Sequence, residues 1–149
     1  MRTRLVIGVA ITSIACSKHD NTIPIITVRG DSVARRIEQK LPRLRHDTAT
    51  IFGLSAEGAT VTASYEGTAL RRLRAEYLGE SGRTTESFYF DSSLVFVTTS
   101  EYRYDRPMTG RVVDSTTRRV DLTLPATPRA TRDSLRAEAE SLLARMKKA

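Results

Sequence analysis

The chain is short of several residue types, and each shortage excludes a class of structure. Its 149 residues include no tryptophan and one cysteine, Cys16. A single cysteine excludes an internal disulfide framework and any zinc site built from pairs of cysteines. No apolar run approaches the roughly 20 residues that a membrane-spanning helix needs. Only 6% of the residues are aromatic, which predicts a lean hydrophobic core.

Motifs for catalysis are equally scarce. The sequence contains no glycine-rich phosphate loop and no Gly-x-Ser-x-Gly elbow. The two histidines, His19 and His46, each precede an aspartate but lack a third ligand or a nucleophile at a telling spacing, so we expect both in solvated loops. Glu76 and Glu86 could approach each other across a hairpin, but two carboxylates on a solvent-exposed sheet face usually have no catalytic role. The sequence therefore predicts a protein without cofactor or metal that is not an enzyme.

The composition is otherwise that of one soluble domain. Hydrophobic residues make up 40% of the chain and charged residues 28%. Lys and Arg number 24 against 17 Asp and Glu, a formal net charge of +7. A basic surface is compatible with anionic partners.

The amino terminus has the pattern of an export signal. Arg2 and Arg4 precede an uncharged, largely apolar run at residues 5–15, and the small residue Ala15 stands directly before Cys16. This pattern resembles the lipobox of bacterial lipoproteins, although Ser13 stands where that motif normally has an aliphatic residue.

The resemblance implies a signal peptide at 1–15 and a tether at 16–29 that begins with a lipidated Cys16, acylated with fatty acids such as palmitate. The protein would then be anchored in a bacterial envelope membrane and would face the periplasm or the exterior. Removal of Arg2 and Arg4 leaves a mature charge of 22 − 17 = +5. Plain secretion is one alternative, and burial of this run as the first strand of a parallel sheet is another.

Residues 30–149 are expected to form a single α+β domain, whose first element is a helix. A short edge strand is possible at 25–28. Apolar residues then recur at helical spacing over residues 32–41, where the side-chain oxygen of Asp31 or Ser32 can cap the first turn.

The middle of the chain changes to a period of two, which predicts an antiparallel meander of four to six strands. Four runs of β-branched and aromatic residues are separated by turn residues, and two further short strands are expected. These segments are 60–65, 69–79, 83–90 and 94–104, followed by 111–114 and 120–124.

The strongest signal is a hairpin with its loop at 91–93. The expected register pairs Phe90 with Leu94 and Phe88 with Phe96, so that both faces are covered near the turn and the far end is wet. Part of this hairpin, residues 89–97, is similar to segments of uncharacterised secreted bacterial lipoproteins, a likeness that implies no activity.

The carboxyl end returns to an amphipathic helix. Thr127 is the expected cap, with Pro128 as the first helical residue and Thr131 as an alternative start. One stripe of this helix is apolar and should cover the sheet. It consists of Leu135, Ala139, Leu142, Leu143 and Met146.

Two groups of residues are candidates for binding. Arg71, Arg72 and Arg74 lie in one strand, where Arg72 and Arg74 share a face, and Tyr102 and Tyr104 share a face of another. Arginine clusters of this kind suit lipid head groups or envelope polysaccharide, but equally form solvated faces balanced by acids. Nucleic acid is not expected, since no recognition motif is present.

Two functions follow from these patterns. The first is a lipid-anchored, non-enzymatic envelope protein that binds a partner protein or an anionic envelope component. The second is a small secreted enzyme or inhibitor whose site is built from Tyr, Glu and Arg side chains. Acids with strongly shifted pKa values in a cleft would favour the second.

Overall fold

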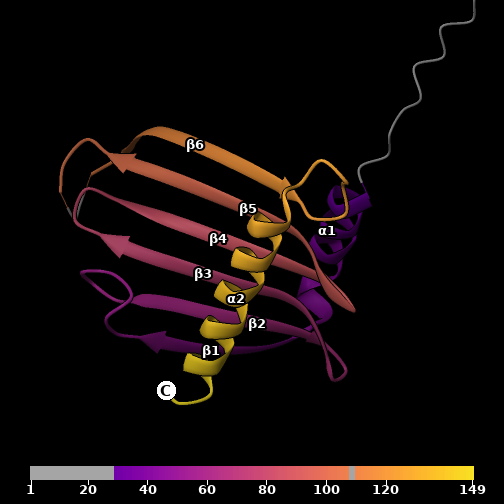
Figure 1. Cartoon of the computed structure of the whole chain (residues 1–149). Helices are drawn as coiled ribbons and strands as arrows, with labels where there is room; N and C mark the ends of the chain where they lie inside the picture. Colours follow the sequence, from indigo (N-terminus) through magenta and orange to yellow (C-terminus); the bar gives the residue numbers. More distant parts are fainter. Residues whose placement is uncertain (1–28, 108–109) are drawn as a thin grey trace, which may run out of the picture.

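A computed structural model describes residues 29–107 and 110–149 of the chain. It contains an antiparallel sheet whose six strands lie in chain order, each hydrogen-bonded to the next (Figure 1). The strands are β1 (Arg45–Ile51), β2 (Ala59–Glu66), β3 (Ala69–Gly79), β4 (Gly82–Asp91), β5 (Ser93–Tyr104) and β6 (Val112–Asp121). The expected antiparallel meander is thus present in an α+β fold.

Two helices lie on opposite faces of this sheet. Helix α1 (Arg29–Lys40) continues into a short 3-10 turn, η1 (Leu41–Arg43), and packs on β4, β5 and β6. Helix α2 (Arg129–Met146) crosses β1, β2 and β3 on the other side (Figure 1). We call the two sides the α1 face and the α2 face.

Each helix buries a separate apolar cluster, because neighbouring residues of a strand point to opposite faces. On the α2 face, Leu73 and Phe88 are fully buried and pack in one cluster with Leu142 of α2. On the α1 face, Ile37 of α1 packs with Tyr89 and Phe96. The β4–β5 hairpin is therefore covered on both sides near its turn, as expected.

The start of α1 differs from the expectation. Helix α1 already includes Arg29, and the amide of Gly30 donates a 3.0 Å hydrogen bond to the carboxylate of Asp121, at the end of β6. Asp31 instead pairs with Arg35, and the Ser32 hydroxyl donates to the Arg29 carbonyl. A distant carboxylate therefore caps the helix, which ties α1 to the last strand.

Three strand predictions need correction. Segment 45–51 is the strand β1, so His46 does not lie in a loop. The two short strands expected at 111–114 and 120–124 are one continuous strand, β6, which ends at Asp121. The polar edge strands lack the apolar alternation by which the inner strands are recognised.

The register of the β4–β5 hairpin also differs beyond its first pair. Phe90 faces Leu94 as expected, but an irregularity between Tyr89 and Phe90 shifts the remaining pairs by one residue. Phe88 therefore faces Val97, and Phe96 faces Tyr89. An added residue in one strand of a pair has this effect.

Helix α2 starts at Arg129, directly after Pro128, and no side chain caps it. Ala139 and Leu142 are buried, and Leu135, Leu143 and Met146 pack against the same cluster. Within the described residues, no helix is long and apolar enough to cross a membrane. The signal peptide at 1–15, Cys16, His19 and the possible strand at 25–28 lie outside the described residues.

Candidate functional site

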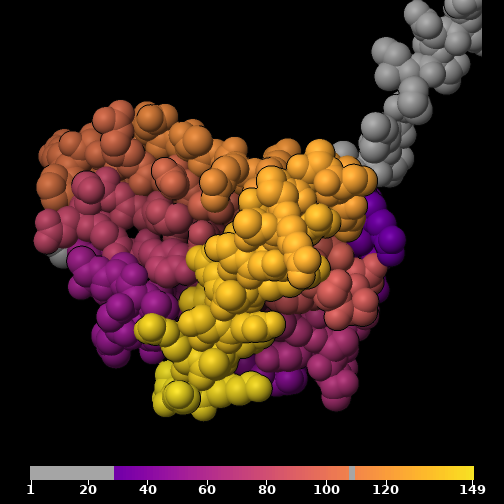
Figure 2. Space-filling view, in the orientation of Figure 1, coloured from indigo at the N-terminus to yellow at the C-terminus, as the bar shows by residue number. Residues whose placement is uncertain are grey.

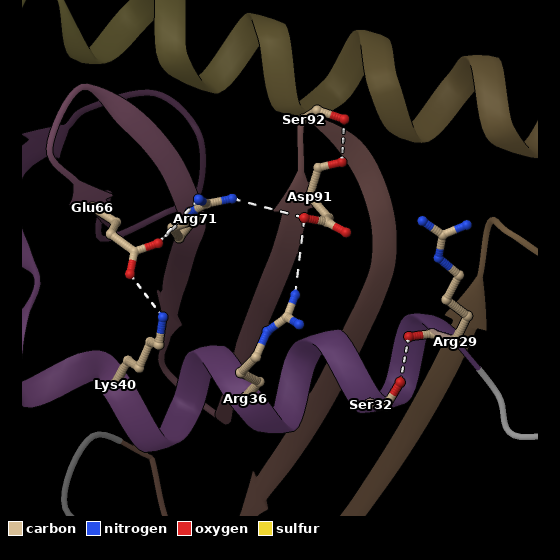
Figure 3. A network of polar contacts seen from close by, with 8 residues as sticks. All are labelled: Arg29, Ser32, Arg36, Lys40, Glu66, Arg71, Asp91 and Ser92. Carbon is tan, nitrogen blue, oxygen red and sulfur yellow. Dashed lines mark hydrogen bonds and ion pairs between the residues drawn. The ribbon is translucent and has the colours of Figure 1, made fainter.

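The three arginines predicted to bind an anion lie in β3, but their surroundings differ. The guanidinium of Arg71 lies 3.0 Å from Glu66 and 3.8 Å from Asp91. The same two carboxylates also pair with Lys40 and Arg36 of α1. Figure 3 shows the resulting network, which joins α1 to the β2–β3 and β4–β5 turns. Hydrogen bonding to Lys40 and its positive charge, aided by Arg71, lower the pKa of Glu66.

Arg72 lies beneath α1. Its guanidinium is 2.9 Å from Glu38 of that helix, and its side chain is only 12% exposed. The hydroxyl of Tyr89 donates a 2.7 Å bond to the same oxygen of Glu38. Burial, together with this hydrogen bond, raises the pKa of Tyr89 to about 12. Arg72 is thus held between the sheet and the helix.

Arg74 lies on the same face as Arg72, as expected, but beyond the part that α1 covers. Its side chain is 42% exposed, and the nearest acid, Glu76, is 3.5 Å away. Glu76 also pairs with Arg83 of β4 at 3.2 Å, and the guanidinium of Arg83 lies 4.8 Å from the ring centre of Tyr102. These four residues form a charged and aromatic strip across β3, β4 and β5.

Two polar rows, which include Arg74 and Glu76, cross all six strands in register on the part of the α1 face that neither described helix covers. The first row is Thr48, Thr62, Arg74, Ser87, Thr98 and Arg119. The second row is Thr50, Thr60, Glu76, Thr85, Ser100 and Thr117. We call these twelve residues the polar rows. All but three are threonine or serine, so the surface offers donors and acceptors at the regular spacing of a sheet.

Eight of the nine hydroxyl residues in these rows are exposed or partly exposed, whereas Ser87 is buried. Two pairs bond to each other, Thr48 with Thr62 at 3.2 Å and Ser100 with Thr117 at 3.0 Å. A hydroxyl has one donor and two acceptor positions, so each retains capacity after such a bond. The polar rows can therefore bind a ligand rich in hydroxyl and carboxylate groups.

An open depression of about 510 Å³ lies at the end of β3–β6. Its lining includes Arg83, Tyr102, Ser115, Tyr77 and Glu101. Figure 2, which views the α2 face, shows that the strand ends beside α2 are not covered by that helix. Tyr104, the second predicted tyrosine, is half-buried, and its amide donates to the carbonyl of Ser81 at 2.9 Å.

A second polar cluster lies on the α2 face beside the helix. The hydroxyl of Tyr77 donates a 3.1 Å hydrogen bond to Glu86. Burial raises the pKa of Glu138 on α2 to about 7, and the charge of Glu86 and a hydrogen bond with it act in the same direction, while Arg118 opposes them. Burial and Glu86 also raise the pKa of Tyr77. Glu86 and Glu138 are therefore close neighbours, and their proximity helps to keep the pKa of Glu138 raised.

The sequence suggested a different pair of neighbouring acids, Glu76 and Glu86. Glu76 and Glu86 point to opposite faces of the sheet, because Glu76 faces Thr85 while Glu86 faces Ala75. Glu138 was not found from the sequence, since only the packing of α2 brings it to β4. The two-residue period of β4 is the one signal that places Glu86 on the face covered by α2.

His46 has a structural role. Its ring nitrogens lie 2.9 Å from the Ser64 hydroxyl and 3.0 Å from the Leu41 carbonyl, which joins β1 to β2 and η1. Among the described residues, no group of three or more His, Cys, Asp or Glu side chains could hold a metal ion.

No protein-family model matches the chain. Comparisons with curated proteins and with solved structures likewise returned no match. Function is therefore inferred from the chemistry of the surfaces described above.

Proposed function

We propose that this protein is a lipid-anchored, non-enzymatic protein of the bacterial cell envelope that binds an anionic polysaccharide. Cys16 would attach it to the membrane, and the polar rows would hold the polymer. The observation that carries this proposal is the in-register array of hydroxyls, with Arg74 and Arg119 in one row of the uncovered α1 face.

The chemistry of this array suits a polymer of acidic sugars. Threonine and serine hydroxyls can donate to and accept from sugar hydroxyls, and guanidinium groups bind carboxylates in a bidentate manner. Arg74 on β3 and Arg119 on β6 are three strands apart, or about 14 Å at the usual strand spacing. Tyr102 adds an aromatic surface beside Arg83. A chain running across the strands would meet all of these groups.

The ion pairs on this face do not prevent binding. Arg74 and Glu76 are both partly exposed and are 3.5 Å apart. Exposed pairs of this kind contribute about 0–1 kcal/mol, so a ligand carboxylate can take the place of Glu76. Arg71 and Arg72, whose partners lie within the molecule, support the shape of the face from its covered end.

The anchor would keep this surface near envelope polymers. Between Cys16 and the first residue of α1, Arg29, the chain advances 29 − 16 = 13 positions. Fully extended, such a segment spans at most about 45 Å. Replacement of Cys16 by serine is expected to move the protein from the membrane fraction to the soluble fraction of its host. Unchanged membrane attachment would contradict the anchor, and mass spectrometry of the mature amino terminus would identify the modification.

The binding surface is tested with polygalacturonate, a polymer of uronic acids, and with neutral dextran. The double variant Arg74→Gln/Arg119→Gln should bind polygalacturonate about tenfold more weakly, a change of about 1.4 kcal/mol. Added salt should weaken binding by the unaltered protein, because exposed charges are screened.

A matched control removes the same charge from the other side of the molecule. Arg129 and Arg136 lie on α2 with exposed side chains. Arg129→Gln/Arg136→Gln should leave binding unchanged within about twofold, the order expected of exposed charges away from the ligand. Equal losses in the two double variants, or equal binding of dextran, would show that the polar rows do not carry a specific site.

The second candidate function is a small secreted enzyme with its site at Tyr77, Glu86 and Glu138. The observation that favours it is the raised pKa of Glu138, about 7, since a general base works best when its pKa lies near the operating pH. Hydrolysis of envelope glycans by the unaltered protein, abolished in Glu138→Gln and half-maximal near pH 7, would support this function over binding alone. Absence of turnover across pH 5–9, with polymer binding intact, would reject it.

A further inference from the structure

The outer edge of β6 has no neighbour among the described strands, and we propose that it pairs with β6 of a second copy of this chain. Strand β6 is the last strand of the sheet (Figure 1), and its residues from Val112 to Arg119 are all exposed. A free edge of this kind presents unpaired backbone donors and acceptors, which another strand can satisfy.

A twofold axis perpendicular to the sheet makes the two strands antiparallel and keeps each face continuous. Residues directly opposite each other then lie on the same face, so the axis must pass through a residue. With the axis at Thr116, residues 114–118 of one copy overlap the same residues of the other in regular register, on the near side of the irregularity at Val113. Asp114 then faces Arg118 of the second copy, and the symmetry repeats this pair.

The sequence of β6 favours this register over its alternatives. An axis at Asp114, Arg118 or Arg119 places like charges directly opposite each other, and an axis at Ser115 or Thr117 creates no pair of opposite charges. Charges of opposite sign facing each other across strands stabilise a pair, and like charges destabilise it. The other edge of the sheet is β1. When two copies of β1 are paired in the same way with five or more residues overlapping, no acid faces a base.

The contacts of Asp114 and Arg118 within one copy leave both available. Asp114 is 3.8 Å from Arg103, and both side chains are largely exposed, at 63% and 70%. Arg118 is exposed at the surface of β6, and within one copy its positive charge acts on Glu138, where it opposes the rise in pKa. Exposed pairs of this kind contribute little within a monomer, so both groups can pair across the edge.

The dimer has a consequence for the polar rows. On the α1 face, Ser115 and Thr117 of one copy would lie opposite Thr117 and Ser115 of the other, so the hydroxyl surface would continue across both sheets. A polymer that spans the twofold axis would contact both copies, and its apparent affinity would rise through effective concentration. The pairing itself does not rest on the proposed function.

Sedimentation velocity of the full-length chain carrying Cys16→Ser tests the proposal, and we expect a concentration-dependent dimer. Asp114→Arg or Arg118→Asp, each alone, places like charges opposite each other and should raise the dimer dissociation constant at least tenfold. The combined variant Asp114→Arg/Arg118→Asp restores the opposite signs and should return it to within about threefold of the unaltered value. Asp133→Arg on α2, with the same change of charge, should have no effect.

Crosslinking tests the register. Thr116→Cys in the same background places the two thiols on the axis, where facing Cα atoms are about 4.5 or 5.5 Å apart, within the range of a disulfide. Val113→Cys is the control, since its two copies would be offset by six residues, or about 20 Å. An oxidised dimer is expected for Thr116→Cys alone. A chain that is monomeric at all concentrations, fails to crosslink at Thr116, or crosslinks equally at Val113 would overturn the proposal.

Discussion

The two faces of the sheet are built from the same six strands, yet they have opposite character. On the α2 face, Val61, Leu73 and Phe88 are fully buried beneath the last helix. On the α1 face, the polar rows lie one residue away in the same strands, and neither of the two described helices covers them. The α1 face is apolar only near Tyr89 and Phe96, where α1 packs.

Within a single strand, the residues of one face therefore contribute to stability, and those of the other face are available for binding. The positions beneath the helices are mainly apolar, as at Leu73 and Phe88 under α2 and at Phe96 under α1, whereas the polar rows consist of hydroxyls and charges. Burial of apolar surface is the main favourable term in folding, and exposed polar positions contribute little to it. Substitutions on the two faces should therefore differ in both the size and the kind of their effects.

The largest difference is expected within β4. Phe88 is fully buried on the α2 face, and Phe88→Ala should lower the free energy of unfolding by about 3–5 kcal/mol. Thr85 belongs to the polar rows of the same strand, and Thr85→Ala should change it by no more than about 0.5 kcal/mol. Urea denaturation of both variants measures the difference. Similar losses would mean that the α1 face contributes to folding as much as the α2 face.

The next effect concerns the link between α1 and β6. A Cβ atom added at Gly30 would lie 2.7–2.8 Å from the carboxylate atoms of Asp121, which also accepts hydrogen bonds from the amide and hydroxyl of Thr123. Gly30→Ala must displace this carboxylate from the helix start and should cost about 2 kcal/mol. Thermal unfolding would report the loss. Gly67→Ala, at a position with a φ of 63° but open space, separates backbone strain from this contact. A Gly30→Ala protein as stable as the original would show that Asp121 does not fix α1.

Much of this architecture follows from local patterns. Strand β3 begins and ends where its period of two and its flanking turn residues place it, and the stripe of α2 identifies Ala139 and Leu142 as buried. These elements are recognisable because one face of each is apolar and covered.

Other elements are decided by contacts between distant parts of the chain. Strand β1 and most of β6 are exposed edges, so burial imposes no alternation on them. The irregularity at Tyr89 and Phe90 changes a register that a simple loop count cannot detect. Two further contacts join residues that are far apart in sequence: Glu86 with Glu138, and Gly30 with Asp121. In the candidate site, the sequence predicted that Arg72 and Arg74 share a face. It did not predict that α1 covers Arg72 and leaves Arg74 partly exposed.

A smaller, pH-dependent effect on stability is expected at Glu138, where α2 lies over the polar part of the sheet. The pKa of Glu138 in the folded protein, about 7, lies above its ordinary value of 4.5, so the folded state binds the proton more tightly than the unfolded state. Its contribution to stability is therefore most favourable below about pH 4.5 and is lost as pH rises toward 7. Glu138→Gln should stabilise the protein at pH 8 by about 1 kcal/mol, after allowance for solvent screening, and have little effect at pH 4.

Urea denaturation at both pH values measures this difference. Glu140→Gln, on the exposed side of α2, is the matched control and should give no pH-dependent gain. A gain of equal size at pH 4 and pH 8 would exclude the titration of Glu138 as its cause. The result would also separate the pair of Glu86 and Glu138 from the polymer surface, since Glu138→Gln leaves the α1 face unchanged.

The smallest effect should distinguish two arginines of one strand. Arg71 pairs with Glu66 and Asp91 at the covered end of the sheet, whereas Arg74 lies in the polar rows. Arg71→Gln should lower stability by about 0.5–1 kcal/mol, because its network is partly exposed, and should leave polygalacturonate binding unchanged within about twofold. Arg74→Gln should leave stability nearly unchanged and should weaken polygalacturonate binding. Denaturation and binding measured on both variants complete the comparison. A larger loss of binding for Arg71→Gln would move the ligand toward α1, because only there do Arg71, Arg36 and Lys40 lie close enough to act together on one anion.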